Sequence, residues 1–112
     1  MAKQRILECT FFIPICRDVN LSDGQLHSAE AWEWLDDELY LRFRGGTEAP
    51  GLYKGFYEDP DTLTRVPDES RKFIVAVGSS DVKVLRRLLA KAKIVFQQKC
   101  FYLSIAGEVE FV

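Results

Sequence analysis

The fold is decided by residues 68–107, DESRKFIVAVGSSDVKVLRRLLAKAKIVFQQKCFYLSIAG. The segment FIVAV (73–77) is apolar at every position and rich in β-branched residues, which predicts a central strand covered on both faces. A polar turn follows, in which Ser80 is placed to cap a helix. Apolar residues then recur every three or four positions as far as Phe96, which predicts a helix with one buried side. The segment CFYLSIA (100–106) alternates as a strand does, so the stretch predicts strand, helix and strand.

The chain before this stretch begins with the same kind of unit. Residues 5–15 (RILECTFFIPI) carry apolar side chains on both faces, which predicts a second central strand that ends at Pro14. A helix is expected from Ser28, its N-cap, to about Arg44, because buried-type residues recur at helical spacing. These residues are Trp32, Leu35, Leu39 and Phe43. Gly45-Gly46 is expected to supply the left-handed residue that ends the helix.

The middle of the chain has weaker strand signals. Residues 47–57 (TEAPGLYKGFY) contain one proline and two glycines, which predicts a strand at an edge of the sheet. After the turn EDPDT, residues 63–66 are expected to form a short hairpin arm, which Pro67 ends before the strand at residues 70–77. Residues 108–112 either extend the last strand or form a short additional one.

Taken in order, these elements predict a single α+β domain over residues 1–112. Right-handed crossovers and two central strands favour a ferredoxin-like sandwich. The expected sheet has four antiparallel strands in the order 4-1-3-2, with an extra hairpin arm. Both helices are expected on one face of that sheet.

Composition narrows the classes of function. The net charge of −2 argues against nucleic acid as a partner, and the apolar runs are too short to span a membrane. The three cysteines have no paired spacing, which indicates reduced thiols and a cytoplasmic protein. His27 is the only histidine, so the common histidine-based metal and catalytic sites lack their residues. We therefore expect no metal and no cofactor.

Several motifs together resemble those of small, uncharacterised single-domain proteins of ferredoxin-like fold. The helical stripe leads through Gly46-Thr47 into a strand with the pattern Gly51-x-Tyr53-x-Gly55, and then into the turn Asp59-Pro60-Asp61. Glu69-Ser70-Arg71 follows and leads into FIVAV. The resemblance covers roughly residue 23 to the end; it supports the fold and implies no activity.

A polar cluster comes just before the central strand FIVAV. Its members, which we treat as candidate ligand-binding residues, are Tyr53, Asp68, Glu69, Ser70 and Arg71. They are predicted to line a small polar pocket near one edge of the sheet. The competing interpretation is a turn held together by local side-chain hydrogen bonds, as is usual for Asp and Ser.

The sheet face that the helices leave open is unusually apolar. Strand alternation places Phe12, Ile74 and Tyr102 on it as candidate interface residues. Such a face can stack nucleic-acid bases, form half of a ligand cavity, or pack against a second copy of the chain. The acidic balance argues against the first, and self-association is the interpretation we favour.

Two hypotheses of function follow. The first is a self-associating, non-enzymatic module that binds a small ligand or another protein. The alternative is a small enzyme with a polar site near Tyr53, Glu69 and Arg71 at a subunit interface. An enzyme should have a solvent-connected pocket with converging polar groups, whereas a packing module should have a dry apolar interface.

Overall fold

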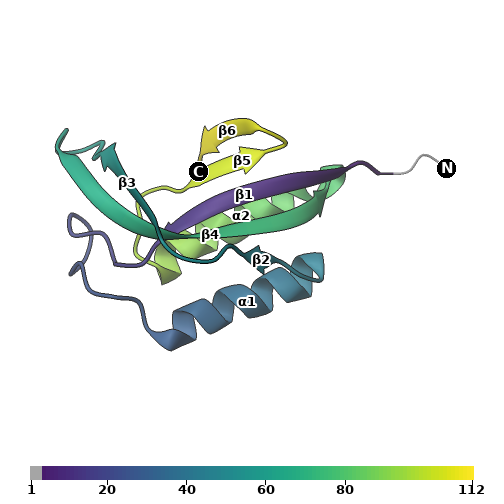
Figure 1. Ribbon diagram of the computed structural model, residues 1–112, viewed down its shortest axis with the longest axis horizontal. Helices are drawn as coiled ribbons and strands as arrows, with labels where there is room; N and C mark the ends of the chain where they lie inside the picture. Colours follow the sequence, from purple (N-terminus) through teal and green to yellow (C-terminus); the bar gives the residue numbers. More distant parts are fainter. Residues whose placement is uncertain (1–3) are drawn as a thin grey trace.

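The centre of the structure, a computed structural model that describes residues 4–112, is a pair of long antiparallel strands (Figure 1). These are β1 (Ile6–Pro14) and β4 (Arg65–Gly78), which pair along nine residues from Ile6↔Gly78 to Pro14↔Ser70. The short strands β2 (Thr47–Glu48) and β3 (Tyr53–Glu58) both pair with β4. On the other side, β1 pairs with β5 (Tyr102–Ile105), which pairs with β6 (Glu108–Phe111). The result is an open, six-stranded antiparallel sheet with the order β2-β4-β1-β5-β6 and β3 also on β4.

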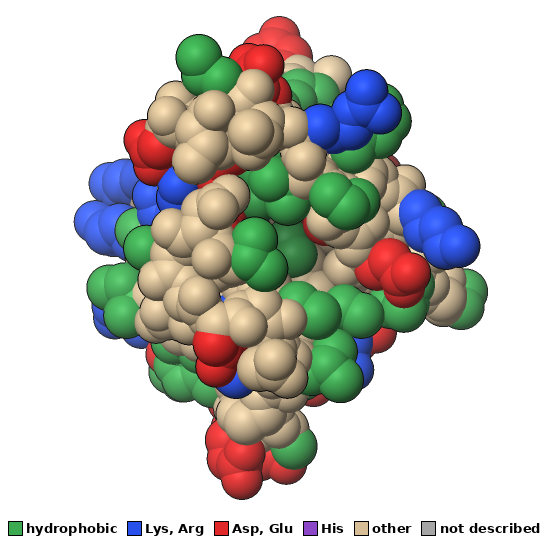
Figure 2. All heavy atoms as spheres, turned by 90° about the vertical axis from the view of Figure 1, so that its left-hand side faces the viewer, with side chains coloured by type: hydrophobic (Ala, Val, Ile, Leu, Met, Phe, Trp, Pro, Cys, Tyr) green, Lys and Arg blue, Asp and Glu red, His purple; other side chains and the backbone are tan. Residues whose placement is uncertain are grey.

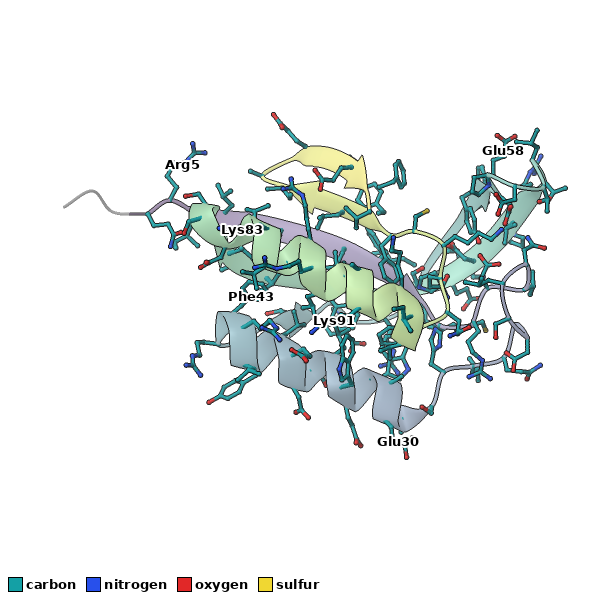
Figure 3. All side chains as sticks on the ribbon, turned by 180° about the vertical axis from the view of Figure 1, so that it is seen from behind. Arg5, Glu30, Phe43, Glu58, Lys83 and Lys91 are labelled. Atoms are coloured by element: carbon teal, nitrogen blue, oxygen red, sulfur yellow. The ribbon has the colours of Figure 1, made fainter. Side chains whose placement is uncertain are left out.

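Two helices, α1 (Ala29–Phe43) and α2 (Val82–Val95), cover one face of this sheet, as Figure 3 shows from behind. Leu35 of α1 and Leu88 of α2 join Phe11 of β1 in one buried cluster. The stripe predicted for the second helix is buried throughout: Leu85, Leu88, Leu89, Ala92 and Phe96. The α+β class and the two helices are therefore confirmed. The sheet, however, has six strands rather than the expected four.

The helix ends differ in detail from the expected ones. Ser28 caps α1 as predicted, because its Oγ accepts a hydrogen bond from the Ala31 N–H at 3.4 Å. The left-handed residue after α1 is Arg44 (φ 65°), not one of the two glycines that follow it. Ser80 does not cap α2: a 3₁₀ turn, η1 (Ser79–Asp81), comes first, and the Ser80 N–H donates to Gln4 instead.

Two strand predictions were wrong for identifiable reasons. The expected edge strand is split into β2 and β3 around Gly51, whose φ of 80° no strand residue adopts. Pro67 does not end the hairpin arm, because β4 runs through it and pairs it with Phe56 of β3. At that point β4 extends beyond the end of β1, so the missing proline N–H faces no second strand. The long hairpin that results runs from Tyr53 in β3 to Ser70 in β4 and projects from one end of the sheet (Figure 1). We call it the arm.

The chain ends in a further hairpin. Ala106 (φ 50°) and Gly107 (φ 88°) connect β5 to β6 by a two-residue turn with both residues at positive φ. This is the turn whose twist suits two antiparallel strands. Of the two outcomes expected for residues 108–112, the structure has the separate strand, which adds Val109 and Phe111 to the open face.

Candidate functional site

The face of the sheet opposite the helices carries a row of aromatic side chains. Phe12 of β1 makes edge-to-face contacts with Tyr53 of β3 (5.6 Å between ring centroids) and Tyr102 of β5 (5.4 Å). Tyr102 contacts Phe111 of β6 in the same way at 6.0 Å. We call these four residues the aromatic wall. Edge-to-face pairs hold aromatic rings in defined orientations, so the wall is an ordered surface rather than a loose patch.

A groove of about 640 Å³ lies between the aromatic wall and the arm. Figure 2 looks at this end of the molecule and shows hydrophobic side chains gathered around a hollow. The polar side chains that line the groove include Asp18, Glu58, Asp68, Ser70, Gln98 and Lys99. A volume of several hundred cubic ångströms with an apolar lining and a few polar groups is typical of small-molecule sites.

Asp68 is the most distinctive polar group of the groove. On β4 it lies opposite Gly55 of β3, and the missing side chain there leaves room for its carboxylate: a Cβ at Gly55 would lie 3.1 Å from Asp68 Oδ1. Its side chain is half-buried, and this burial raises the pKa of Asp68 above its usual value. Within residues 4–112, no hydrogen bond or ion pair reaches its carboxylate. The groove therefore contains a partly desolvated acid with no cation of its own.

Two other charged groups that line the groove, Asp18 and Lys99, are engaged in hydrogen bonds. Asp18 is buried and accepts hydrogen bonds from the Tyr57 hydroxyl (3.0 Å) and the Asn20 N–H (2.7 Å). Burial, followed by the bond to Asp18, raises the pKa of Tyr57 well above its usual range, so the Tyr57 hydroxyl stays protonated and donates its hydrogen bond to Asp18. Lys99 donates to Asp59 at 3.0 Å and to Asp61 at 2.6 Å. Lys54 and Glu58 also line the groove but are exposed to solvent, so Asp68 is the free charge there that is partly desolvated.

The aromatic wall can also bind a cation. The ammonium of Lys72 lies over the Tyr53 ring at 5.5 Å from its centroid. Cations are attracted to the faces of tyrosine rings by the ring quadrupole. An aromatic wall beside an unpaired carboxylate is chemically suited to a ligand that combines a flat ring with a cation.

The predicted ligand-binding residues are divided between the two faces of β4. Tyr53, Asp68 and Ser70 come together in the groove, where Ser70 is buried opposite Tyr53. Glu69 and Arg71 alternate with them along the strand, so they belong to the other face. The Arg71 guanidinium stacks on Trp32 at 4.0 Å and lies 3.8 Å from Glu48.

A second cavity of about 660 Å³ adjoins the groove along the arm. Glu69 lines this cavity, together with Cys16 and Arg17, and Asp18, Tyr57 and Asp68 line both hollows. Arg17 is held by Asp23 at 2.7 Å, which lowers the pKa of Asp23 to about 2. The two cavities share seven lining residues, which makes the region around Asp68 their junction: Pro14, Asp18, Lys54, Gly55, Tyr57, Asp68 and Gln98.

Sequence reasoning missed several residues of the site. Asp18, Tyr57 and Lys99 lie in three segments that only the folded arm brings together, and no local pattern marks them. Phe111 was within reach, since it alternates with Glu110 in EVEF and so belongs to one face of a strand. The predicted interface residues Phe12, Ile74 and Tyr102 all lie on the open face, where Thr10 pairs with Ile74 and Phe12 with Lys72.

Among residues 4–112, no three His, Cys, Asp or Glu side chains are grouped so that they could hold a metal ion. In the same part of the chain, no helix has the length and apolarity needed to cross a membrane. Cys9, Cys16 and Cys100 are all free thiols, and burial raises the pKa of both Cys9 and Cys100, which makes them less reactive.

Comparison with solved structures shows which known proteins share this fold. No protein-family model and no curated protein sequence matches the chain. Two solved structures match: a phage S-adenosylmethionine (SAM) lyase in complex with S-methyl-5'-thioadenosine, and a phage SAM lyase in the apo state. The first has a TM-score of 0.72 and 13% identity over 100% of this chain and 94% of that chain. The second has a TM-score of 0.64 and 15% identity over 95% and 87%.

These matches correct two expectations from the sequence. The resemblance to small, uncharacterised ferredoxin-like proteins was wrong, because the structural likeness over the full chain is to phage SAM lyase. The preferred hypothesis of a non-enzymatic module is contradicted by the same likeness, because the structures of similar fold are those of a SAM lyase, one of them with S-methyl-5'-thioadenosine bound. The alternative hypothesis, a small enzyme, agrees better with it.

Proposed function

We propose that this protein is an enzyme that cleaves SAM to S-methyl-5'-thioadenosine in the groove between the aromatic wall and the arm. The observation that carries the proposal is the unpaired, half-buried carboxylate of Asp68 beside that wall. SAM consists of a flat adenine, a ribose, a sulfonium cation and an amino-acid end. The likeness of fold to a SAM lyase supports the same assignment.

Each part of SAM finds a suitable partner in the groove. The adenine can stack on the rings of Tyr53 and Tyr102, which border the groove at about 38% and 37% exposure. Asp68 can accept a hydrogen bond from the α-ammonium and attract the nearby sulfonium. Ser70 can donate a hydrogen bond to the carboxylate, and the Tyr57 hydroxyl oxygen, whose hydrogen is donated to Asp18, can accept one from the ribose.

The chemistry asks little of the protein beyond this binding. When the carbon–sulfur bond of the amino-acid chain breaks, the electron pair stays on sulfur and the sulfonium becomes a neutral thioether. A lyase uses no water, so the nucleophile comes from within the substrate: an oxygen of its own α-carboxylate donates a lone pair to the carbon and forms a C–O bond as the C–S bond breaks. The amino-acid end then leaves as a five-membered cyclic ester beside the neutral thioether. Positive charge on sulfur disappears as the bond breaks, and an apolar groove that excludes water favours such a loss of charge.

The first test is direct. Purified protein is incubated with SAM, and S-methyl-5'-thioadenosine is measured by liquid chromatography and mass spectrometry against a no-enzyme blank. We expect formation of the thioether well above the blank, lost in large part with Asp68→Asn and kept with Glu69→Gln, the neighbour on the opposite face. Equal activity of wild type and Asp68→Asn would remove the groove from the proposal.

We further propose that the open face contacts a second copy of the chain, which would place the site at a subunit interface. Ile74 and Ala76 continue the apolar surface away from the groove, and Val109 and Phe111 on β6 are 50% and 72% exposed. The acidic net charge speaks against nucleic acid there. Free thiols in all three cysteines are consistent with a cytoplasmic location.

Two features of the fold complete the proposal. Pairing of β1 with both β4 and β5 supports a ferredoxin-like order of the four strands expected from the sequence. One buried cluster shared by both helices and the sheet supports a single domain. A single cooperative transition in the thermal unfolding of residues 1–112 is expected for a single domain.

A further inference from the structure

We propose that Asp59 is a positioning residue, which latches the arm against the body of the protein and so sets the geometry of the groove. The inference rests on the proposed function, because its effect is on SAM turnover. Asp59 lies in the turn that connects β3 to β4, yet its side chain is completely buried. A charged side chain buried in a turn at the far end of an arm is unusual and needs several partners.

The partners of Asp59 come from three segments of the chain. Its Oδ1 accepts from the backbone N–H groups of Asp61 (2.9 Å) and Thr62 (3.0 Å), which shapes the turn itself. Its Oδ2 accepts from the Asn20 side chain at 3.0 Å and from the Lys99 ammonium at 3.0 Å. Asn20 belongs to the loop after β1, and Lys99 belongs to the segment between α2 and β5.

The contacts of Asp59 with Asn20 and Lys99 are not needed to form the turn. Two backbone donors are enough for an aspartate that closes a turn on its own. The Asn20 and Lys99 contacts span 39 and 40 residues of sequence and order two further side chains. Leu63 in the same turn has a left-handed φ of 57°, which is unfavourable for a branched side chain. The shape of the turn is therefore held by its surroundings.

The latch is connected directly to the site. Asn20, which holds Asp59, also donates its backbone N–H to Asp18, and Asp18 accepts from the hydroxyl of Tyr57 on the arm. Asp18, Tyr57 and Lys99 all line the groove. The arm carries Tyr53 and Asp68, whereas β1 and β5 carry Phe12 and Tyr102, so the position of the arm sets the distance between the two sides.

The experiment compares variants of the full chain. Asp59→Asn keeps Oδ1 as the acceptor for the turn, which also lies 3.2 Å from the Lys99 ammonium, but loses the negative charge and the Oδ2 acceptor for Asn20 and Lys99. Lys99→Met removes the ammonium and keeps the stem. Lys99→Arg keeps the charge and serves as the conservative rescue. Asp61→Asn is the matched control, because Asp61 also contacts Lys99 but its side chain is 74% exposed. Circular dichroism at the assay temperature confirms folding.

We expect Asp59→Asn and Lys99→Met to raise both the KM for SAM and the Kd for S-methyl-5'-thioadenosine by about 10-fold or more, since displaced binding groups lose alignment. Lys99→Arg and Asp61→Asn should stay within about threefold of wild type. A purely structural role would lower kcat through a smaller folded fraction and leave KM and Kd unchanged, and that result would overturn the inference. Wild type that forms no S-methyl-5'-thioadenosine would instead refute the proposed function.

Discussion

The sharpest prediction from the groove concerns the difference between substrate and product in the variant Asp68→Asn. In the proposed site SAM would place its sulfonium and ammonium near this carboxylate, whereas S-methyl-5'-thioadenosine is neutral. Two unit charges about 4 Å apart interact by about 4 kcal/mol near a protein surface. Because the Asp68 side chain is only half-buried, water screens part of this, and about 2 kcal/mol remains. That corresponds to a loss of roughly 30-fold in affinity for SAM.

The product should behave differently, because stacking on the aromatic wall does not involve the charge of Asp68. We expect the Kd for S-methyl-5'-thioadenosine to change by less than about threefold, measured by isothermal titration calorimetry, while the KM for SAM rises. Glu69→Gln, on the opposite face of β4, should alter neither constant. Burial raises the pKa of Asp68, so protonation in acid should weaken binding of SAM to wild type before it weakens binding of the thioether. Equal loss for both ligands in Asp68→Asn would refute the reasoning, since it would mean a collapsed groove rather than a missing charge.

Three further predictions concern stability and assembly. Leu88→Ala should lower the free energy of unfolding by about 2–5 kcal/mol in urea melts, because Leu88 is buried in the core and its truncation leaves a cavity. A loss below about 1 kcal/mol would contradict this packing. Burial lowers the pKa of His27 below its usual 6.5. The free energy of unfolding should therefore be highest above pH 6.5 and fall in acid, because the unfolded chain takes up a proton that the folded chain does not. His27→Gln should flatten this dependence, and an unchanged slope of unfolding free energy against pH would exclude His27 as its cause. Ile74→Glu should dissociate the proposed assembly in light scattering while circular dichroism stays native, and a wild type that is monomeric at tens of micromolar would refute the interface.

Much of the fold is predictable from local patterns, because burial imposes periodicity on the sequence. The stripe from Leu85 to Phe96 is buried as its spacing predicts. In the first helix Leu35 and Leu39 are buried, and the other two predicted residues, Trp32 and Phe43, are partly buried against the core. The alternation in β1 correctly separates Phe11, which faces the helices, from Phe12, which faces the groove. Such patterns are strong wherever one side of an element is dry and the other is wet.

The site was less predictable, and one error explains most of the difference. Pro67 is expected to end a strand, and the side chains of residues 68–71 are expected either to line one pocket or to form a locally bonded turn. In the structure β4 continues through Pro67, and strand alternation sends Asp68 and Ser70 to one face and Glu69 and Arg71 to the other. Whether Pro67 lies beside one neighbouring strand or two depends on where β1 ends, and the sequence around residue 67 carries no information about that.

The latch was beyond prediction for a different reason. Asp59 is marked in the sequence only as part of the turn Asp59-Pro60-Asp61, where aspartate is common without any partner. Its contacts with Asn20 and Lys99 depend on how far the arm bends back toward the body. That bend follows from the twist of the whole sheet rather than from any local motif.

The most direct test of the central claim is a crystal structure of the protein with S-methyl-5'-thioadenosine. We predict the adenine against the rings of Tyr53 and Tyr102, with the thioether sulfur directed toward Asp68. Asp59→Asn crystals treated in the same way should have the ligand displaced or weakly bound. A ligand found outside this groove, or a groove that stays empty at saturating ligand, would contradict the account.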